Sequence, residues 1–115
     1  MQKVSKYNSL RHYQWGEECD GWVLLDEETL SVKQERMPPL TSERLHYHKY
    51  AQQFFFILKG VATFEVEDQT YTIQPGEGLN IEAGCKHRIL NNTAEDLEFI
   101  LCSQPSTKND RINCE

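Results

Sequence analysis

Apolar and polar residues alternate in short runs along most of the chain, and turn-forming residues separate the runs. Alternation with a period of two is typical of β-strands that bury one face. The strongest turn signals are the proline pair at 38–39 and the Pro-Gly-Glu-Gly stretch at 75–78. The runs predict strands over residues 21–26, 30–37, 42–48, 53–58, 61–66, 71–73, 79–81, 86–91 and 97–102. Many short, closely spaced strands predict an all-β sandwich or barrel.

One run, residues 53–58, is apolar on both faces. Alternation places Gln53, Phe55 and Ile57 on one face, and Phe54, Phe56 and Leu58 on the other. A single barrel buries only the first of these faces, so the second needs a cover. We expect a homodimer in which two sheets pack face to face. The alternative is that the N-terminal arm of the same chain covers this face.

The chain divides into three parts by its pattern. Residues 1–20 show no sustained period and predict a loosely structured N-terminal arm with at most one short strand. Residues 21–104 hold the predicted barrel, and residues 105–115 form a polar C-terminal tail. A total of 115 residues fits one domain.

Charge and composition exclude several function classes. The formal charge is -6, which argues against binding to nucleic acid, because that requires a basic face. No apolar run reaches the roughly 20 residues of a membrane span, and residues 1–6 lack the apolar core of a signal peptide. The four cysteines show no CxxC spacing. We therefore expect a soluble, cytoplasmic protein with free thiols and a small-molecule ligand.

Three of the four histidines lie in predicted strands. His46 and His48 are two residues apart, so their side chains point to the same face of one strand, and His87 lies in another strand. Neutral imidazole is the commonest metal ligand near neutral pH. The spacing predicts that these histidines share one metal ion, and the alternative is that they are ordinary core or surface residues.

Two stretches resemble the motifs of the cupin superfamily. The family pattern G-x5-H-x-H-x3,4-E-x6-G is matched by His46-x-His48-x4-Gln53-x6-Gly60. The pattern G-x5-P-x-G-x2-H-x3-N is matched by Gly76-x5-Glu82-x-Gly84-x2-His87-x3-Asn91. The resemblance implies a small single-domain cupin with a double-stranded β-helix (jelly-roll) barrel. It also implies that His46, His48, Gln53 and His87 hold one divalent transition metal, such as zinc, nickel, iron, manganese or cobalt.

The chain departs from the family pattern at three positions. Leu40 replaces the first glycine, Glu82 replaces the proline, and Gln53 replaces the metal-binding glutamate. Glutamine offers a carbonyl oxygen without charge, so a divalent ion would keep its full +2 charge and would be a stronger Lewis acid. The alternatives are that Gln53 swings away from a three-histidine site, or that the protein binds no metal.

The predicted inward faces supply candidate substrate contacts. Arg44 shares the face of His46 and His48 by alternation, and Gln34 and Arg36 are expected to face inward from residues 30–37. A guanidinium beside a metal binds carboxylate or phosphate groups well, although a salt bridge at the rim is the alternative role. The apolar wall is expected to consist of Phe55, Ile57, Ile89, Phe99 and Leu101.

The sequence leaves open whether the protein is an enzyme. We favour a metal-dependent isomerase or lyase that acts on a small polar molecule such as a sugar or a keto acid. The alternatives are a non-catalytic small-molecule binding or sensor module and an iron-dependent dioxygenase. Small cupins of pectin breakdown can also carry the glutamine, but they use an acidic residue on the last strand. The matching position here is Leu101, which counts against that activity.

Overall fold

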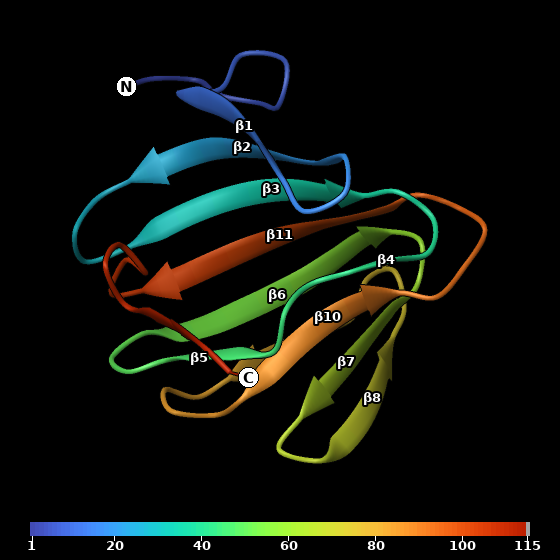
Figure 1. Ribbon diagram of the computed structural model, residues 1–115. Coiled ribbons are helices and arrows are strands. Elements are labelled where there is room, and N and C mark those ends of the chain that lie inside the picture. The colour runs from blue at the N-terminus through green and yellow to red at the C-terminus, as the bar shows by residue number, and fades with distance from the viewer. Residues whose placement is uncertain (115) are drawn as a thin grey trace.

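The computed structural model describes residues 1–114 and shows two antiparallel β-sheets that face each other (Figure 1). The first sheet has the order β1 (Arg11–Trp15), β2 (Cys19–Asp26), β3 (Ser31–Met37), β11 (Leu97–Gln104), β6 (Gln52–Lys59), β9 (Gly78–Ile81). The second has the order β12 (Arg111–Asn113), β5 (His46–His48), β10 (His87–Asn91), β7 (Ala62–Val66), β8 (Gln69–Ile73), and β4 (Thr41–Ser42) also pairs with β10. The predicted all-β, double-stranded β-helix fold is confirmed. Within residues 1–114, no helix is long and apolar enough to cross a membrane.

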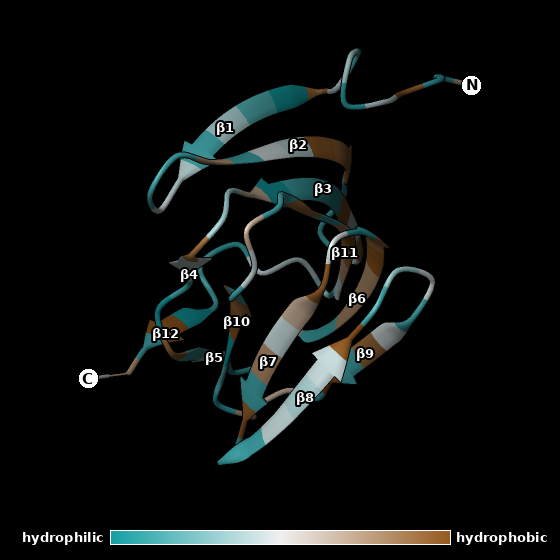
Figure 2. Cartoon of the chain, turned by 90° about the vertical axis from the view of Figure 1, so that its right-hand side faces the viewer, coloured by the Kyte–Doolittle hydropathy of each residue, from teal (hydrophilic) through white to brown (hydrophobic). Residues whose placement is uncertain are grey.

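The core lies between the two sheets and follows the alternation of the sequence. On β6 the residues Gln53, Phe55 and Ile57 are buried, while the residues between them are exposed. β6 and β7 show broad brown, apolar segments, whereas most of β8 is white and teal (Figure 2). All five residues of the predicted apolar wall are buried: Phe55, Ile57, Ile89, Phe99 and Leu101. Burial of each such side chain contributes about 1.5–3 kcal/mol to folding.

Both chain ends take part in the sheets. β1 pairs with β2 over its full length, so residues 11–15 form a short strand of the kind that the prediction allowed in the N-terminal arm. In the predicted polar tail, β12 pairs with β5, and Glu115 lies outside the described residues. The buried carboxylate of Asp110 accepts hydrogen bonds from the backbone N–H groups of residues 49–51, at 2.9 to 3.2 Å. This contact holds the C-terminal segment against the loop between β5 and β6.

The predicted strand over residues 42–48 is broken into β4 and β5. Leu40 adopts a positive φ of 61°, and residues 43–45 lie between the two short strands. The Glu43 N–H still bonds to the carbonyl of Ile89 (3.0 Å), but strict alternation is lost. The break decides which side chains reach the barrel interior.

Candidate metal centre and cavity

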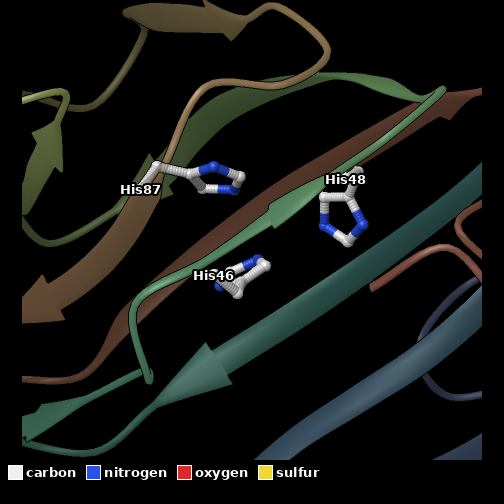
Figure 3. A group of neighbouring side chains, drawn as sticks. All are labelled: His46, His48 and His87. Carbon is white, nitrogen blue, oxygen red and sulfur yellow. The ribbon is translucent and has the colours of Figure 1, made fainter. Parts of the chain in front are cut away.

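Three histidines from two neighbouring strands converge inside the barrel. His46 and His48 come from β5, and His87 comes from β10, where it pairs with His46 in the strand register. Their rings turn toward a common space (Figure 3), with centroid separations of 4.3 to 5.8 Å. One nitrogen of each ring lies within 4.8 Å of the others, and all three residues are buried. This arrangement allows one ion to contact all three imidazoles.

Backbone carbonyls determine where the protons of two rings sit. Nδ1 of His46 donates to the carbonyl of Arg44 (2.8 Å), and Nδ1 of His87 donates to the carbonyl of Cys85 (2.9 Å). Because a carbonyl only accepts, Nδ1 carries the hydrogen in both rings and Nε2 has a free lone pair. Among the described residues, neither ring nitrogen of buried His48 has a hydrogen-bond partner. Unpaired buried nitrogens of this kind are what a metal ion would satisfy.

Gln53 completes the group of four. Its side-chain oxygen Oε1 lies 3.2 Å from Nε2 of His87, and its amide nitrogen donates to Oγ of Ser103 (3.2 Å). Two acceptors therefore face each other across a buried gap. Turning the amide would let its nitrogen donate to His87 and its oxygen accept from Ser103, but it would leave both ring nitrogens of His48 without a partner. A cation between these side chains satisfies His87, Gln53 and His48 together. The donor set fits a divalent transition metal.

Burial keeps the three imidazoles neutral. Desolvation lowers the pKa of His46 to about 3 and that of His48 to about 4, and it also lowers the pKa of His87. The nearby guanidinium of Arg111 adds to each shift. Neutral imidazoles keep their lone pairs at pH 7, which is the form that binds a metal ion.

Glu43 lies behind the first histidine. One carboxylate oxygen is 3.8 Å from Nδ1 of His46, and the other is 3.4 Å from Nη1 of Arg111. Burial raises the pKa of Glu43 to about 7, against the lowering effect of Arg111. The carbonyl of Arg44, not Glu43, receives the hydrogen bond from this ring, so Glu43 acts on His46 through its charge alone.

A cavity of about 260 Å³ opens beside these side chains. Its lining includes His46, His48, Gln53, Phe55 and Leu101. Its polar lining comes from five elements or connections and consists of Tyr13, Lys33, Glu35, Glu43, Thr107 and Arg111. The candidate site is therefore a buried ligand cluster next to a polar, charged pocket.

The structure corrects the predicted orientation of Arg44. This residue lies in the break between β4 and β5, its side chain is exposed, and it does not line the cavity. Glu43 reaches the interior in its place. The alternation argument was wrong here because it treated residues 42–48 as one continuous strand.

Gln34 and Arg36 also face the opposite way from the prediction. In the register of β3 and β11, Lys33 pairs with Leu101 and Glu35 pairs with Phe99, so the inward face of β3 carries Lys33 and Glu35. On the outer face, Arg36 donates to Asp20 (2.8 Å) and Gln34 donates to Glu98 (3.2 Å). The prediction was wrong because the alternation in this strand is weak, and polar residues occupy both faces.

Sequence reasoning missed the residues that give the cavity its charge. Lys33 and Glu35 share a face of β3 with buried Met37. The apolar Met37 could have indicated that this face points into the barrel. Tyr13 and Arg111 come from the two ends of the chain, where no periodic pattern indicated a strand. Their positions depend on long-range pairing that local sequence does not encode.

Comparison with known proteins agrees with this architecture. Residues 33–103 match a family model described as a cupin domain. The chain is 25% identical over 60 residues to the polyketide synthase CurC of Streptomyces cyaneus, which covers 52% of this chain and 39% of CurC. The chain thus aligns with well under half of that relative.

Solved structures show the same fold at low sequence identity. A predicted oxalate decarboxylase from Thermotoga maritima superposes with a TM-score of 0.81 at 21% identity, covering 91% of this chain and 100% of that one. A sugar phosphate isomerase from Silicibacter pomeroyi gives a TM-score of 0.69 at 19% identity, covering 76% of this chain and 60% of that one. At these identities the likeness concerns the fold alone.

Proposed function

This chain belongs to the cupin family, and on that premise we propose that it is a metal-dependent enzyme of the isomerase or lyase type. Its substrate is a small polar molecule such as a sugar or a keto acid. The observation that carries the proposal is a buried group of four potential metal ligands, three neutral imidazoles and one amide oxygen. This group borders a charged cavity. Structural ligand clusters are closed, whereas catalytic ones border an open space.

His46, His48, His87 and Gln53 are the proposed ligands of one divalent transition metal. When bound, such an ion supplies a Lewis acid that polarises a substrate carbonyl. Gln53 adds no negative charge to the set, so the ion's +2 charge is retained. The carbonyls of Arg44 and Cys85 hold the rings of His46 and His87 in the orientation that presents Nε2.

Lys33 and Arg111 are the proposed binding groups for an anionic part of the substrate. Arg111 lies on β12 beside His48, and Lys33 lies on β3, so they line the cavity from opposite sheets. Their charges balance those of Glu35 and Glu43, so the cavity would become positive when a divalent ion binds. A positive cavity attracts carboxylate or phosphate groups, and Arg111 can bind them in a bidentate manner. Arg111 thus takes the role that the sequence assigned to Arg44.

The size of the cavity favours a small substrate. Sites for drug-sized ligands typically measure about 300–1,000 Å³, and this cavity is smaller, at about 260 Å³. A sugar acid or a short keto acid suits this volume.

We also propose a homodimer that forms through the outer face of the first sheet. Phe54, Phe56 and Leu58 are exposed there, with relative exposures of 41%, 37% and 44%. Lys6 from the N-terminal segment packs over Trp22, with Nζ 5.3 Å from the ring centroid, but the three β6 residues stay uncovered. A second copy of the same sheet would bury this apolar patch.

A cytoplasmic location is proposed as well. All four cysteines are free, including buried Cys19. Free thiols are typical of a reducing compartment.

Metal-free protein reloaded separately with zinc, manganese, iron, nickel or cobalt tests the proposed activity on a panel of uronates, keto sugars and keto acids. Turnover should require a metal and should be lost in His48→Ala. Arg111→Gln should raise KM for anionic substrates more than for neutral ones. Absence of turnover with every loaded form would contradict the enzyme proposal. Oxygen uptake by the iron form would point to a dioxygenase, and ligand binding that survives loss of the histidines would point to a binding module.

A further inference from the structure

A row of three residues crosses the first sheet and ends in the cavity. Tyr13 of β1 pairs with Gly21 of β2, and Gly21 pairs with Glu35 of β3. Neighbouring strands lie about 4.8 Å apart, so Tyr13 and Glu35 are separated by about 10 Å of backbone. Because paired residues share a face, both side chains point into the barrel, where both line the cavity.

Gly21 leaves the space through which the Tyr13 side chain reaches Glu35. A Cβ atom at Gly21 would overlap the ring of Tyr13, which lies directly over the glycine. The ring therefore crosses β2, and its hydroxyl donates a hydrogen bond to Oε2 of Glu35. Lys33 lies beside the pair, with Nζ 5.7 Å from the centroid of the Tyr13 ring. Tyr13 and Glu35 therefore pair across three strands, because Gly21 between them has no side chain.

The two carboxylates that line the cavity, Glu43 and Glu35, differ in how many protein groups contact their oxygens. Glu43 contacts His46, Arg111 and the N–H of Ile89 (3.4 Å), so both of its oxygens are occupied by protein groups. Glu35 accepts from Tyr13 through Oε2, and within residues 1–114 no hydrogen-bond donor reaches its Oε1. A carboxylate oxygen that lines a cavity without a protein donor is available to a substrate.

From this geometry we infer that Glu35 is the proton-transfer residue of the site and that Tyr13 is its positioning residue. The inference rests on the proposed function. Oε1 of Glu35 accepts the proton from a substrate carbon next to a carbonyl. The electron pair of the broken C–H bond becomes the new carbon–carbon π bond, and the carbonyl π electrons move to the carbonyl oxygen. In an isomerisation, Glu35 then returns the proton to the former carbonyl carbon, while the hydroxyl proton of the adjacent carbon moves to the former carbonyl oxygen and the new carbonyl forms at the adjacent carbon. In an elimination, the carbonyl re-forms, the carbon–carbon double bond shifts as the bond to the leaving group breaks, and Glu35 gives its proton to the leaving group.

The electrostatic setting supports this role. Burial raises the pKa of Glu35, which makes its carboxylate a stronger base, while the Tyr13 hydroxyl, Lys33 and Arg111 lower the pKa and keep the base ionisable. Glu43 is the other acid that lines the cavity, and its charge interacts unfavourably with that of Glu35. A general base works best when its pKa lies near the operating pH.

Deuterium exchange tests the assignment directly. Zinc-loaded protein in D₂O is mixed with pyruvate or dihydroxyacetone, and loss of the C–H signals next to the carbonyl is followed by proton NMR. Glu35→Gln should lower the exchange rate by about 100-fold and Tyr13→Phe by about 10-fold. The exposed Glu28→Gln serves as the matched control and should exchange like wild type. Wild-type exchange in Glu35→Gln together with loss in His48→Ala would overturn the role of Glu35 and leave the proposed function standing, whereas no exchange in wild type would contradict both.

A second measurement needs no catalytic activity. The side-chain carboxyl of Glu35 is followed by ¹³C NMR as a function of pH in metal-free protein, with Glu35→Gln used to assign the signal. Removal of the Tyr13 donor should raise the pKa of Glu35, so its titration midpoint should move upward in Tyr13→Phe. Gly21→Ala should give the same shift because it displaces the ring without changing either titrating group. An unchanged midpoint in both variants would overturn the pairing of Tyr13 with Glu35.

Discussion

Nε2 of His87 and Oε1 of Gln53 lie 3.2 Å apart as two acceptors that face each other in the barrel interior. The hydrogen of His87 is on Nδ1, which donates to the carbonyl of Cys85, so Nε2 presents a lone pair. Both atoms are buried, and close contact of two acceptors is unfavourable unless a cation or a proton lies between them or the amide is turned. A turned amide leaves both ring nitrogens of His48 without a partner, whereas a metal ion would contact His48, His87 and Gln53 together.

The first prediction concerns metal content and affinity. Protein purified without chelator or added metal should contain one divalent ion per chain by elemental analysis. Gln53→Glu should tighten zinc binding by about tenfold or more, because a carboxylate adds a negative charge at the ion. His87→Ala should lose the metal.

Gln52→Glu is the matched control for that substitution, because residue 52 is exposed on the same strand and faces outward. It changes the net charge equally and should leave zinc affinity unchanged. Equal affinity in the Gln53 and Gln52 variants, or purified protein without any metal that also fails to take up zinc, would contradict the assignment of the centre.

The second prediction concerns the link between the C-terminal segment and the metal ligands. The carboxylate of Asp110 accepts from three consecutive N–H groups in the loop that joins His48 to Gln53. Asp110→Ala should lower the free energy of unfolding by about 3 kcal/mol, because it removes charge-assisted hydrogen bonds and leaves buried donors without a partner. It should also weaken zinc binding, since the loop places two ligands.

Urea denaturation and zinc titration measure both effects. The exposed Asp26→Asn is the control and should change neither quantity noticeably, because its ion pair with Arg11 is long, at 3.9 Å, and exposed. A stable Asp110→Ala variant with normal zinc affinity would show that β12 does not support the site.

The third prediction compares a glycine that is needed only for its positive φ with one that also packs closely against backbone. Gly60 and Gly84 both have positive φ values, 80° and 85°. A Cβ at Gly60 would lie 2.5 Å from the carbonyl oxygen of Asp96, whereas nothing lies within 4 Å of a Cβ at Gly84. Gly84→Ala should therefore cost only the left-handed strain of about 1–2 kcal/mol, and Gly60→Ala should cost about 2 kcal/mol more because backbone must move. Equal unfolding free energies for the two variants would refute the steric argument.

Local sequence patterns were sufficient for the fold class and for the strands with strong alternation. Phe55 and Ile57 were placed on the face of Gln53 and Phe54 and Phe56 on the other, because side chains alternate along a strand, and burial in β6 alternates in the same way from Gln52 to Leu58. The family motif located the four side chains that the structure brings together. These predictions depend on neighbours within one strand or on fixed spacing.

The rest of the site depends on contacts between distant parts of the chain. β3 carries polar residues on both faces, so only its pairing with β11 shows that Glu35 faces inward. Tyr13 reaches the cavity because β1 adds to the edge of the sheet and Gly21 leaves space. Arg111 reaches it because Asp110 anchors the tail to the loop after β5. No local period in the sequence reports these pairings.

The fourth prediction is a pH-dependent stabilisation by Glu35→Gln in metal-free protein. Burial raises the folded-state pKa of Glu35 above its unfolded value of 4.5. The favourable contribution of the protonated form is thus fully present below pH 4.5 and is lost as the pH rises through the folded-state pKa. Glutamine cannot ionise, so the variant should gain stability relative to wild type as the pH increases.

Urea denaturation of both proteins at pH 4.5 and pH 8 measures this difference. Loss of the Glu35 charge also lowers the pKa of Glu43, which adds to the advantage of the variant at pH 8. The variant's advantage should be larger at pH 8. A constant difference between the two proteins at both pH values would contradict the raised pKa of Glu35.

The last prediction concerns the outer face of the first sheet. Phe56→Glu places a charge in the centre of the exposed apolar patch formed by Phe54, Phe56 and Leu58. If two copies bury this patch, the variant should weaken the dimer by about 30-fold or more, because a buried aromatic anchor is replaced by an unpaired charge. Tyr71→Glu is the control: Tyr71 is similarly exposed (40%) but lies on β8 of the other sheet. Light scattering after size exclusion should show a wild-type dimer, an unchanged Tyr71 variant and a monomeric Phe56 variant that still binds zinc, whereas a monomeric wild type at micromolar concentration would refute the dimer.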